Sequence, residues 1–175
     1  KEFKQLFPVL ALDVDADIRS SYKGGFTYLS PKYKEKTTGA GLTLDVNSMY
    51  PAKMCQEYLP YGIPEPFEGK YQADPLYPLY TQRLTCTFDI KPDKIPSIQL
   101  KSCPSFMPNE YIESSRGEIV TLTLTNPDLE LFFQQYDVNV IKYHGGRKLK
   151  KAKGIFTKYT DHWTAQNIKA KTEGN

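Results

Sequence analysis

The sequence predicts an α+β domain whose strands are mostly antiparallel. Residues 84–90 and 119–125 alternate apolar with polar side chains, which is the pattern of strands that bury one face. Residues 126–130 read Asn-Pro-Asp-Leu-Glu, and an N-cap, an early proline and first-turn acids are typical of a helix start. Thirteen prolines and thirteen tyrosines against one tryptophan favour many chain reversals over long helices.

The length of 175 residues allows one compact domain, or one domain and part of a second, and excludes a complete multidomain enzyme. With 39% hydrophobic and 25% charged residues, the composition is that of a folded protein. The net charge is only +3, but residues 142–175 hold nine lysines and arginines against two acids. Such a basic end is typical of a polyanion-binding surface, and a solvated basic helix face is the alternative.

The first part of the chain contains two candidate strands and one candidate helix. Residues 7–12 form an apolar run that ends at three alternating aspartates in residues 13–17, which predicts a strand and a polar turn. The aspartates do not make an EF-hand calcium loop, because glycine and glutamate are missing at the positions that such a loop requires. Residues 42–45 alternate like a strand, and a helix follows with Ser48 as its N-cap and Pro51 in its first turn.

The rest of the chain continues the mixed pattern. Prolines crowd residues 60–80, so we expect no regular structure there. The elements expected next are strands at 84–90 and 119–125, a helix at 127–136 and a strand at 138–143. Gly145 and Gly146 predict a turn, and apolar spacings of three and four from Ile155 to Trp163 predict a final helix.

The cysteines and the apolar runs indicate a reduced protein that acts inside the cell. Cys55, Cys86 and Cys103 are odd in number and too far apart for a C-x-x-C metal motif or a dense disulfide framework. No window approaches about 18 apolar residues, and residues 1–5 lack the apolar run of a signal peptide. We therefore expect neither secretion nor a membrane partner.

Several catalytic motifs are absent from the sequence. The only two histidines, His144 and His162, lie in the basic region and suggest no Ser-His-Asp triad. The glycines match neither a P-loop nor a G-x-G-x-x-G motif. Asp45 is the stronger candidate, because it is a carboxylate at a strand end beside a helix start, whose N–H groups attract phosphate. A hard cation on that carboxylate would bridge to a polyphosphate.

Residues 45–51, Asp-Val-Asn-Ser-Met-Tyr-Pro, resemble motif A of the family B DNA polymerases, D-x-x-S-x-Y-P. Residues 22–25 are similar to the Y-x-G-G motif of the protein-primed branch of that family, found in bacteriophages and linear plasmids. That branch carries an insertion after motif A, called terminal protein region 1. Four segments resemble it: residues 61–71, 109–111, 117–119 and 128–131. The order of these motifs along most of the chain makes the resemblance specific.

The resemblance implies a partial polymerase palm with an inserted α+β subdomain that is mixed but mostly antiparallel. Residues 1–54 would be a linker and the first part of the palm, residues 55–153 the insertion, and residues 154–175 a return helix toward the palm. The family's Y-x-D-T-D motif, which holds a second catalytic carboxylate, and its K-x-x-x-N-S-x-Y-G helix do not occur in the sequence. We therefore expect an internal fragment of a longer polymerase, without polymerase activity of its own.

The resemblance also implies roles for single residues. Asp45 would be one of two carboxylates that hold two Mg²⁺ ions, and the carbonyl of Val46 would face one metal. Ser48 would contact the triphosphate of the incoming deoxynucleotide, and Tyr50 would lie under its sugar and exclude a 2′-hydroxyl. Glycines let backbone N–H groups approach phosphates, so one loop would hold the template strand. The residues of that loop are Tyr22, Gly24 and Gly25.

The implied partners are template and primer DNA, deoxynucleoside triphosphates and a terminal protein that serves as primer, in the cytoplasm of the host cell. Five residues of the basic region are also predicted, from their positive charge, to contact DNA phosphates. They are Arg147, Lys148, Lys150, Lys151 and Lys153. Each candidate has a structural alternative: a strand-end or capping carboxylate, a core tyrosine, a simple turn at residues 22–25, or a solvated lysine stripe. A separate module that binds nucleic acid or a terminal protein is the alternative function.

Overall fold

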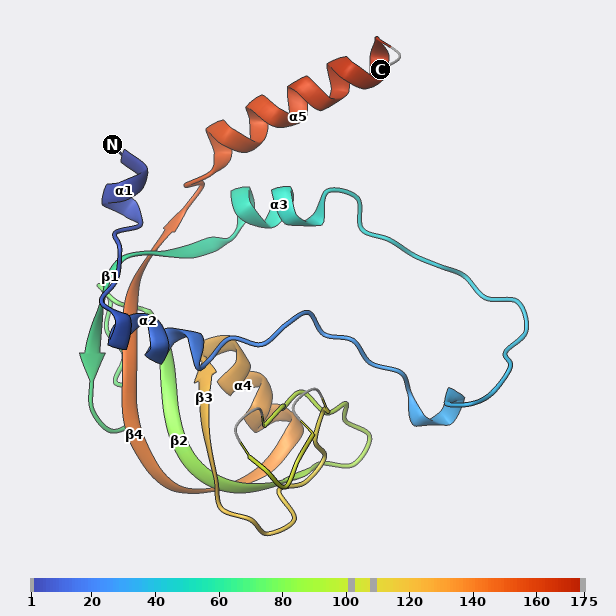
Figure 1. Cartoon of the computed structure of the whole chain (residues 1–175), viewed down its shortest axis with the longest axis vertical. Coiled ribbons are helices and arrows are strands. Elements are labelled where there is room, and N and C mark those ends of the chain that lie inside the picture. Colours follow the sequence, from blue (N-terminus) through green and yellow to red (C-terminus); the bar gives the residue numbers. More distant parts are fainter. Residues whose placement is uncertain (1, 101–102, 108–109, 174–175) are drawn as a thin grey trace. The chain divides into compact units, whose positions relative to one another are not determined.

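The computed structural model describes residues 2–100, 103–107 and 110–173. In order, the elements are α1 (Glu2–Leu6), α2 (Leu12–Arg19), a 3-10 helix (Pro31–Tyr33), α3 (Met49–Gln56), β1 (Tyr58–Phe67), β2 (Leu79–Ile90), β3 (Val120–Thr125), α4 (Asn126–Gln135), β4 (Tyr136–Lys153) and α5 (Thr157–Thr172) (Figure 1). The predicted α+β class is therefore confirmed. Within the described ranges, no helix combines the length and the apolar character needed to cross a membrane.

The strands form one sheet in the spatial order β1-β4-β2-β3. β2 pairs antiparallel with β3, where Arg83 lies opposite Thr123, and it also pairs antiparallel with β4. β2 alternates because Leu84, Cys86 and Phe88 are buried, whereas Arg83 and the odd-numbered threonines belong to the opposite face. The predicted strands at 84–90 and 119–125 are thus confirmed, with β2 starting five residues earlier.

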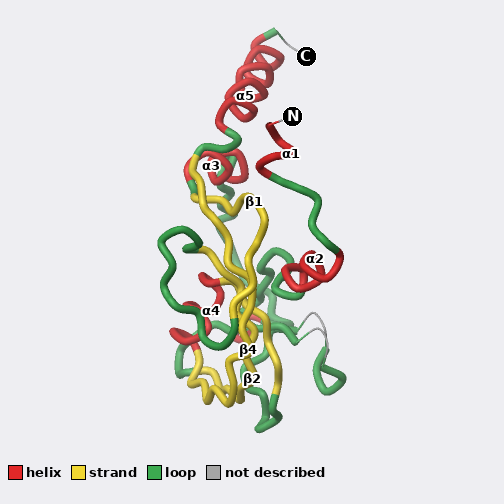
Figure 2. The backbone as a smooth tube through the Cα atoms, turned by 90° about the vertical axis from the view of Figure 1, so that its left-hand side faces the viewer, coloured by secondary structure: helices red, strands yellow, loops and turns green. Residues whose placement is uncertain are grey.

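The core lies between α4 and one face of β2 and β3. Figure 2 shows α4 beside the sheet. The rings of Phe88, Phe132 and Tyr136 pack together with centroids 5.1 to 5.3 Å apart, and none of them is more than 1% exposed. The Tyr136 hydroxyl donates to the carbonyl of Ile112 and accepts from the N–H of Ser97, both at 2.8 Å. These two bonds tie the segment between β2 and β3 to the core.

The predicted helix at residues 127–136 is confirmed as α4, but its cap differs. Thr125, not Asn126, is the N-cap: its hydroxyl accepts from the N–H of Asp128 at 3.4 Å and donates to the Asp128 carboxylate at 2.7 Å. Asn126 uses its side-chain oxygen to accept from the N–H of Tyr80 at 3.4 Å. The Asn126 side chain therefore links α4 to β2, and Thr125 caps the helix.

The chain divides into two compact units. The first unit comprises Lys1–Phe26 and Tyr61–Lys150 and includes β2, β3, α2 and α4. The second unit comprises Thr27–Pro60 and Lys151–Asn175, and within it α3 packs against α5. The division at residues 54 and 153 that the resemblance implies stays a prediction.

The expected strand at residues 7–12 is wrong, and Leu12–Arg19, which includes the expected polar turn, forms α2. Asp13 and Asp15 lie in the first turn of α2, where carboxylates oppose the positive end of the helix dipole. The Arg19 side chain pairs with Asp15 at 2.6 Å, one helical turn away. Alternating aspartates resemble a turn in sequence, but this charge arrangement favours a helix.

Two expectations for the middle of the chain are also wrong. Residues 42–45 form no strand, because no described strand pairs with them, and Leu42 and Leu44 are each 83% exposed. Residues 58–67 form β1 although prolines crowd them. β1 lies at an edge of the sheet, where prolines are tolerated because one side of an edge strand has no partner strand that needs their N–H groups.

Gly145 and Gly146 do not form the expected turn, because they lie inside β4. A side chain on Gly146 would collide with the carbonyl oxygen of Thr81 on the neighbouring strand, so the close approach of β4 and β2 requires glycine. The strand predicted at 138–143 is confirmed, and it continues through the basic run to residue 153. The predicted final helix is confirmed as α5.

Candidate functional sites

The motif A segment lies in the second unit, where Asp45 and Val46 precede α3 in an extended, exposed stretch. Val46 is 66% exposed and Tyr50 is 77% exposed, so Tyr50 does not pack in a core of the described residues. The Asp45 carboxylate and the Val46 carbonyl are hard oxygen donors, which Mg²⁺ prefers. No group of three or more His, Cys, Asp or Glu among the described residues is placed to bind a metal. Further ligands would have to come from elsewhere.

α3 begins at the predicted corner. Ser48 occupies its N-cap position, but with a left-handed backbone (φ 55°, ψ 32°) and without the expected side-chain capping bond. The Ser48 carbonyl accepts the N–H of Ala52 at 3.0 Å and so starts the helix. Because no side chain caps this end, the N–H groups of Met49 and Tyr50 are available to an anion, whereas Pro51 has none. A serine in the left-handed backbone conformation lowers the stability of the fold by about 1 kcal/mol, and such strained residues are frequent at functional sites.

The Y-x-G-G segment belongs to the first unit and follows α2. Its lysine is tied down: Lys23 Nζ lies 2.7 Å from the Asp128 carboxylate and donates to the Ser97 carbonyl at 3.3 Å. Gly24 and Gly25 are exposed, and a side chain on either would meet nothing within 4 Å. Packing within the described residues therefore does not require these glycines, which leaves their backbone open to a ligand.

Two of the predicted DNA-contacting residues are already engaged with acids of the first unit. Arg147 donates through two nitrogens to the Asp17 carboxylate, at 2.7 and 2.9 Å, and only 16% of its side chain is exposed. Lys148 lies 2.7 Å from Asp74 and 4.9 Å from the ring centroid of Tyr77. The hydrogen bond between them raises the pKa of Lys148 and lowers that of Asp74. Both positive charges are thus largely neutralised within the chain.

The other three predicted lysines are exposed and form no ion pair with a carboxylate in the part of the chain that the structure describes. In the first unit, Lys150 Nζ lies 5.5 Å from the centroid of Tyr77. In the second unit, Lys151 and Lys153 lie 4.6 and 6.0 Å from the centroid of Tyr58. Each lysine therefore has an aromatic neighbour and keeps its charge available, as nucleic-acid-binding surfaces require.

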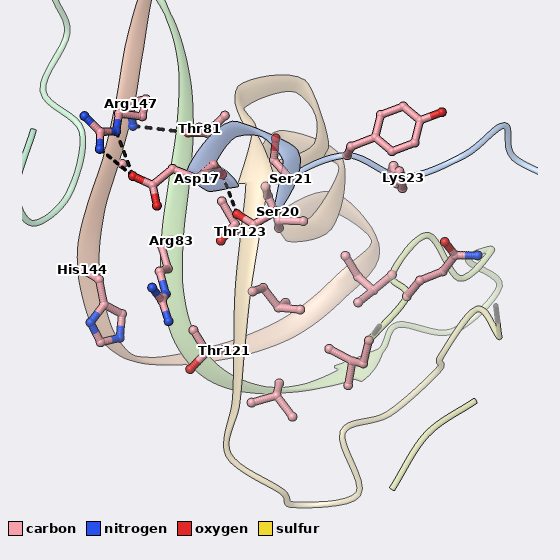
Figure 3. A pocket seen from close by; sticks show the side chains of 18 of the residues that line it. Asp17, Ser20, Ser21, Lys23, Thr81, Arg83, Thr121, Thr123, His144 and Arg147 are labelled. Carbon is pink, nitrogen blue, oxygen red and sulfur yellow. Dashed lines mark hydrogen bonds and ion pairs between the residues drawn. The ribbon is translucent and has the colours of Figure 1, made fainter. Parts of the chain in front are cut away.

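A hollow of about 720 Å³, which was not predicted from the sequence, opens in the first unit (Figure 3). Residues 20–23, residues 97–100 and the strands β2, β3 and β4 line it. Arg83 of β2 lies between His144 of β4 and the threonines of β3. In the sequence, the residues of this hollow are visible only as the polar positions of two alternating strands. Such positions are typical of a sheet face that contacts solvent.

Hydroxyl groups connect the three strands at this hollow. Thr85 Oγ1 lies 2.7 Å from His144 Nε2 and 2.9 Å from Thr121 Oγ1. Thr121, Thr123, Arg83 and His144 all line the hollow. The arrangement combines the Arg83 guanidinium with several hydroxyl groups, which is a set of hydrogen-bond donors suited to an oxyanion.

Known proteins are similar to this chain over most of its length. The family model described as DNA polymerase type B, organellar and viral, matches residues 1–175. The DNA polymerase of Bacillus phage phi29 is 47% identical over 174 residues, which cover 99% of this chain and 30% of the relative. The DNA polymerase of Streptococcus phage Cp-1 is 32% identical over 147 residues, which cover 81% of this chain and 26% of the relative.

The solved structure of phi29 DNA polymerase complexed with primer-template DNA and incoming nucleotide substrates has the same fold. It matches with a TM-score of 0.89 at 47% identity and covers 94% of this chain and 29% of that chain. The chain thus spans about 30% of the length of the curated relatives that it matches.

Proposed function

The chain belongs to the organellar and viral family of type B DNA polymerases, and on that premise we propose that it is part of a polymerase that replicates DNA from a protein primer. One observation carries this proposal: 94% of the chain matches a phage polymerase structure that contains primer-template DNA and incoming nucleotides. We propose the host cytoplasm as its place of action. The reaction is the transfer of a deoxynucleotide to a primer hydroxyl.

Asp45 and the carbonyl of Val46 would hold Mg²⁺, whose donor preference they match. When bound, the metal ions stabilise the entering and leaving oxygens of nucleotidyl transfer. Ser48 and the N–H groups of the first turn of α3 would bind the triphosphate, because that helix end has no capping side chain. The exposed ring of Tyr50 would lie under the sugar and exclude a 2′-hydroxyl.

Two substitutions in the complete polymerase test these roles. Asp45→Asn keeps the size of the side chain and removes its charge, so nucleotide addition with Mg²⁺ should fall more than about 100-fold. Asp161→Asn, which makes the same change at another exposed aspartate, on α5, is the matched control. Tyr50→Val should lower the preference for deoxynucleotides over ribonucleotides while deoxynucleotide addition continues. Normal rates in Asp45→Asn, or unchanged sugar discrimination in Tyr50→Val, would refute the motif A assignment.

DNA would be bound at two places, each with separate support. Tyr22, Gly24 and Gly25 would hold the template strand, since the two glycines leave an open backbone. The basic run would contact phosphates chiefly through its three lysines without a carboxylate partner, while Arg147 and Lys148 contribute less because acids neutralise them. The members of the run are Arg147, Lys148, Lys150, Lys151 and Lys153.

Salt dependence tests the role of the basic run. Replacing Lys150, Lys151 and Lys153 by alanine should reduce the slope of log affinity against log salt by about 2 to 3, because up to three phosphate contacts are lost. Three exposed lysines outside the run, replaced in the same way, are the control: Lys32, Lys34 and Lys36. Equal slopes in both variants would show that the run is a solvated face.

The 175-residue chain alone should not add nucleotides, because the Y-x-D-T-D motif with the second catalytic carboxylate does not occur in its sequence. The segments that resemble terminal protein region 1 support a terminal protein as a further partner. A polymerase assay and a binding assay with the isolated chain separate these functions. Nucleotide addition by the chain alone would refute the two-carboxylate requirement, whereas DNA binding without addition would match the alternative of a binding module.

A further inference from the structure

We propose that the hollow of the first unit is a binding site for the phosphodiester backbone of a DNA strand, with Arg83 as its central contact. This proposal rests on the proposed polymerase function, because that function brings DNA to the molecule. The hollow is distinct from the motif A segment, which belongs to the second unit, and from the lysines that follow Arg147.

The charges of the lining favour an anion. Three cationic side chains line the hollow, Lys23, Arg83 and Arg147, against the single carboxylate of Asp17. Asp17 is occupied by two hydrogen bonds from Arg147, and Lys23 is paired with Asp128. Arg83 has an exposed side chain and forms no ion pair with a carboxylate of the described residues. The guanidinium of Arg83 is therefore the cation that a phosphate would neutralise.

The sheet register places hydroxyl donors next to that guanidinium. Arg83 lies opposite Thr123 on β3, and the neighbouring pair on the same face is Thr85 and Thr121. Side chains directly opposite each other on antiparallel strands have Cβ atoms about 5 Å apart, so one phosphate can reach a guanidinium and a hydroxyl together. An arginine fork and short hydroxyl side chains are the groups with which proteins contact DNA phosphates.

The hollow also continues the surface on which we place the template strand. Tyr22 and Lys23 of the Y-x-G-G segment line its wall, and both belong to the same unit as Arg83. A strand held at Gly24 and Gly25 would thus need to run only a short way to place its next phosphates in the hollow. An acidic polypeptide would satisfy the same charge, but this continuity with the Y-x-G-G segment favours nucleic acid.

The test is DNA binding by the complete polymerase, measured by fluorescence anisotropy with single-stranded oligonucleotides over a range of salt. Arg83→Gln should weaken binding by about fivefold to tenfold and reduce the salt slope by about 0.7, the value for one phosphate on a single strand. Arg83→Lys should keep the slope. Thr123→Val, which removes a hydroxyl without changing charge, should weaken binding about twofold to fivefold at an unchanged slope. Lys94→Gln, an exposed lysine outside the hollow, is the control.

The possible results separate this site from the proposed function. If Arg83→Gln behaves like Lys94→Gln in both affinity and slope, the hollow does not bind DNA and the proposal is overturned. It is also overturned if Arg83→Gln weakens only the binding of polyglutamate, a probe for an acidic protein partner. Circular dichroism establishes that each variant is folded. Nucleotide addition by the unmodified polymerase on a primed template, measured in parallel, tests the polymerase function independently of Arg83.

Discussion

Replacing Tyr136 by phenylalanine removes one oxygen atom from the centre of the core and leaves the ring in place. In the structure that oxygen accepts from the N–H of Ser97 at 2.8 Å and from the N–H of Ile98 at 3.4 Å, and it donates to the carbonyl of Ile112 at 2.8 Å. Tyr136 is 1% exposed, so water cannot readily replace the lost partner. The variant therefore leaves buried backbone groups without hydrogen bonds.

The expected cost follows from those groups. A buried donor or acceptor that loses its partner costs about 1 to 3 kcal/mol, and at least one N–H and one carbonyl are affected, so we expect a loss of about 3 kcal/mol. The ring contacts with Phe88 and Phe132 do not involve the hydroxyl, so no cavity term adds to this. For a chain of this size the loss corresponds to a fall in Tm of about 6 to 12 °C.

Urea unfolding of the 175-residue chain, followed by far-UV circular dichroism, measures the effect. Tyr159→Phe is the matched control, because Tyr159 is 60% exposed and α5 lies in the second unit. That variant should change the free energy of unfolding by less than about 0.5 kcal/mol. The reasoning is refuted if Tyr136→Phe and Tyr159→Phe unfold at the same urea concentration, since the hydroxyl would then not hold the segment between β2 and β3.

Three further outcomes are expected. Burial raises the pKa of the Cys86 thiol above its ordinary range, to about 11, so iodoacetamide should spare Cys86 at pH 8, and stability should fall as pH rises from 9 toward 11. A double-mutant cycle with Lys23→Met and Asp128→Asn should give a coupling of about 1 kcal/mol by urea unfolding; zero coupling contradicts the observed pair. Gly146→Ala should lower stability by about 3 kcal/mol, and Gly41→Ala, which meets open space, by much less.

The sequence predicted the elements whose signals are local. β2 and β3 alternate because one face of each is buried, and α4 starts with residues that favour a helix in any context. The strand expected at residues 42–45 failed because alternation does not provide a partner strand. The turn at Gly145 and Gly146 failed for the opposite reason, since these glycines serve the approach of a neighbouring strand that is distant in sequence.

The candidate sites divide in the same way. Asp45 and the Y-x-G-G segment were identified from short motifs, whose residues are close together in the sequence. The sequence did not show that Lys148 is neutralised by Asp74 whereas Lys150 is not, because only the fold brings Asp74 to β4. Arg83 was missed entirely, because its meaning depends on threonines of a strand some forty residues further along the chain.

The position of β4 in the sheet constrains the synthesis of the protein. β4 follows the other three described strands in the sequence, yet it lies between β1 and β2, so neither of these strands can complete its pairing with β4 until residue 153 has left the ribosome. During that interval β1 and β2 present unpaired edges, which can recruit strands of other nascent chains. Pairings between residues distant in the sequence form slowly, which prolongs the time for which the sheet is incomplete. A polysome translating this region therefore holds several incomplete sheets close together. Chaperone capture should therefore concentrate on the stretch of translation between β2 and the end of β4.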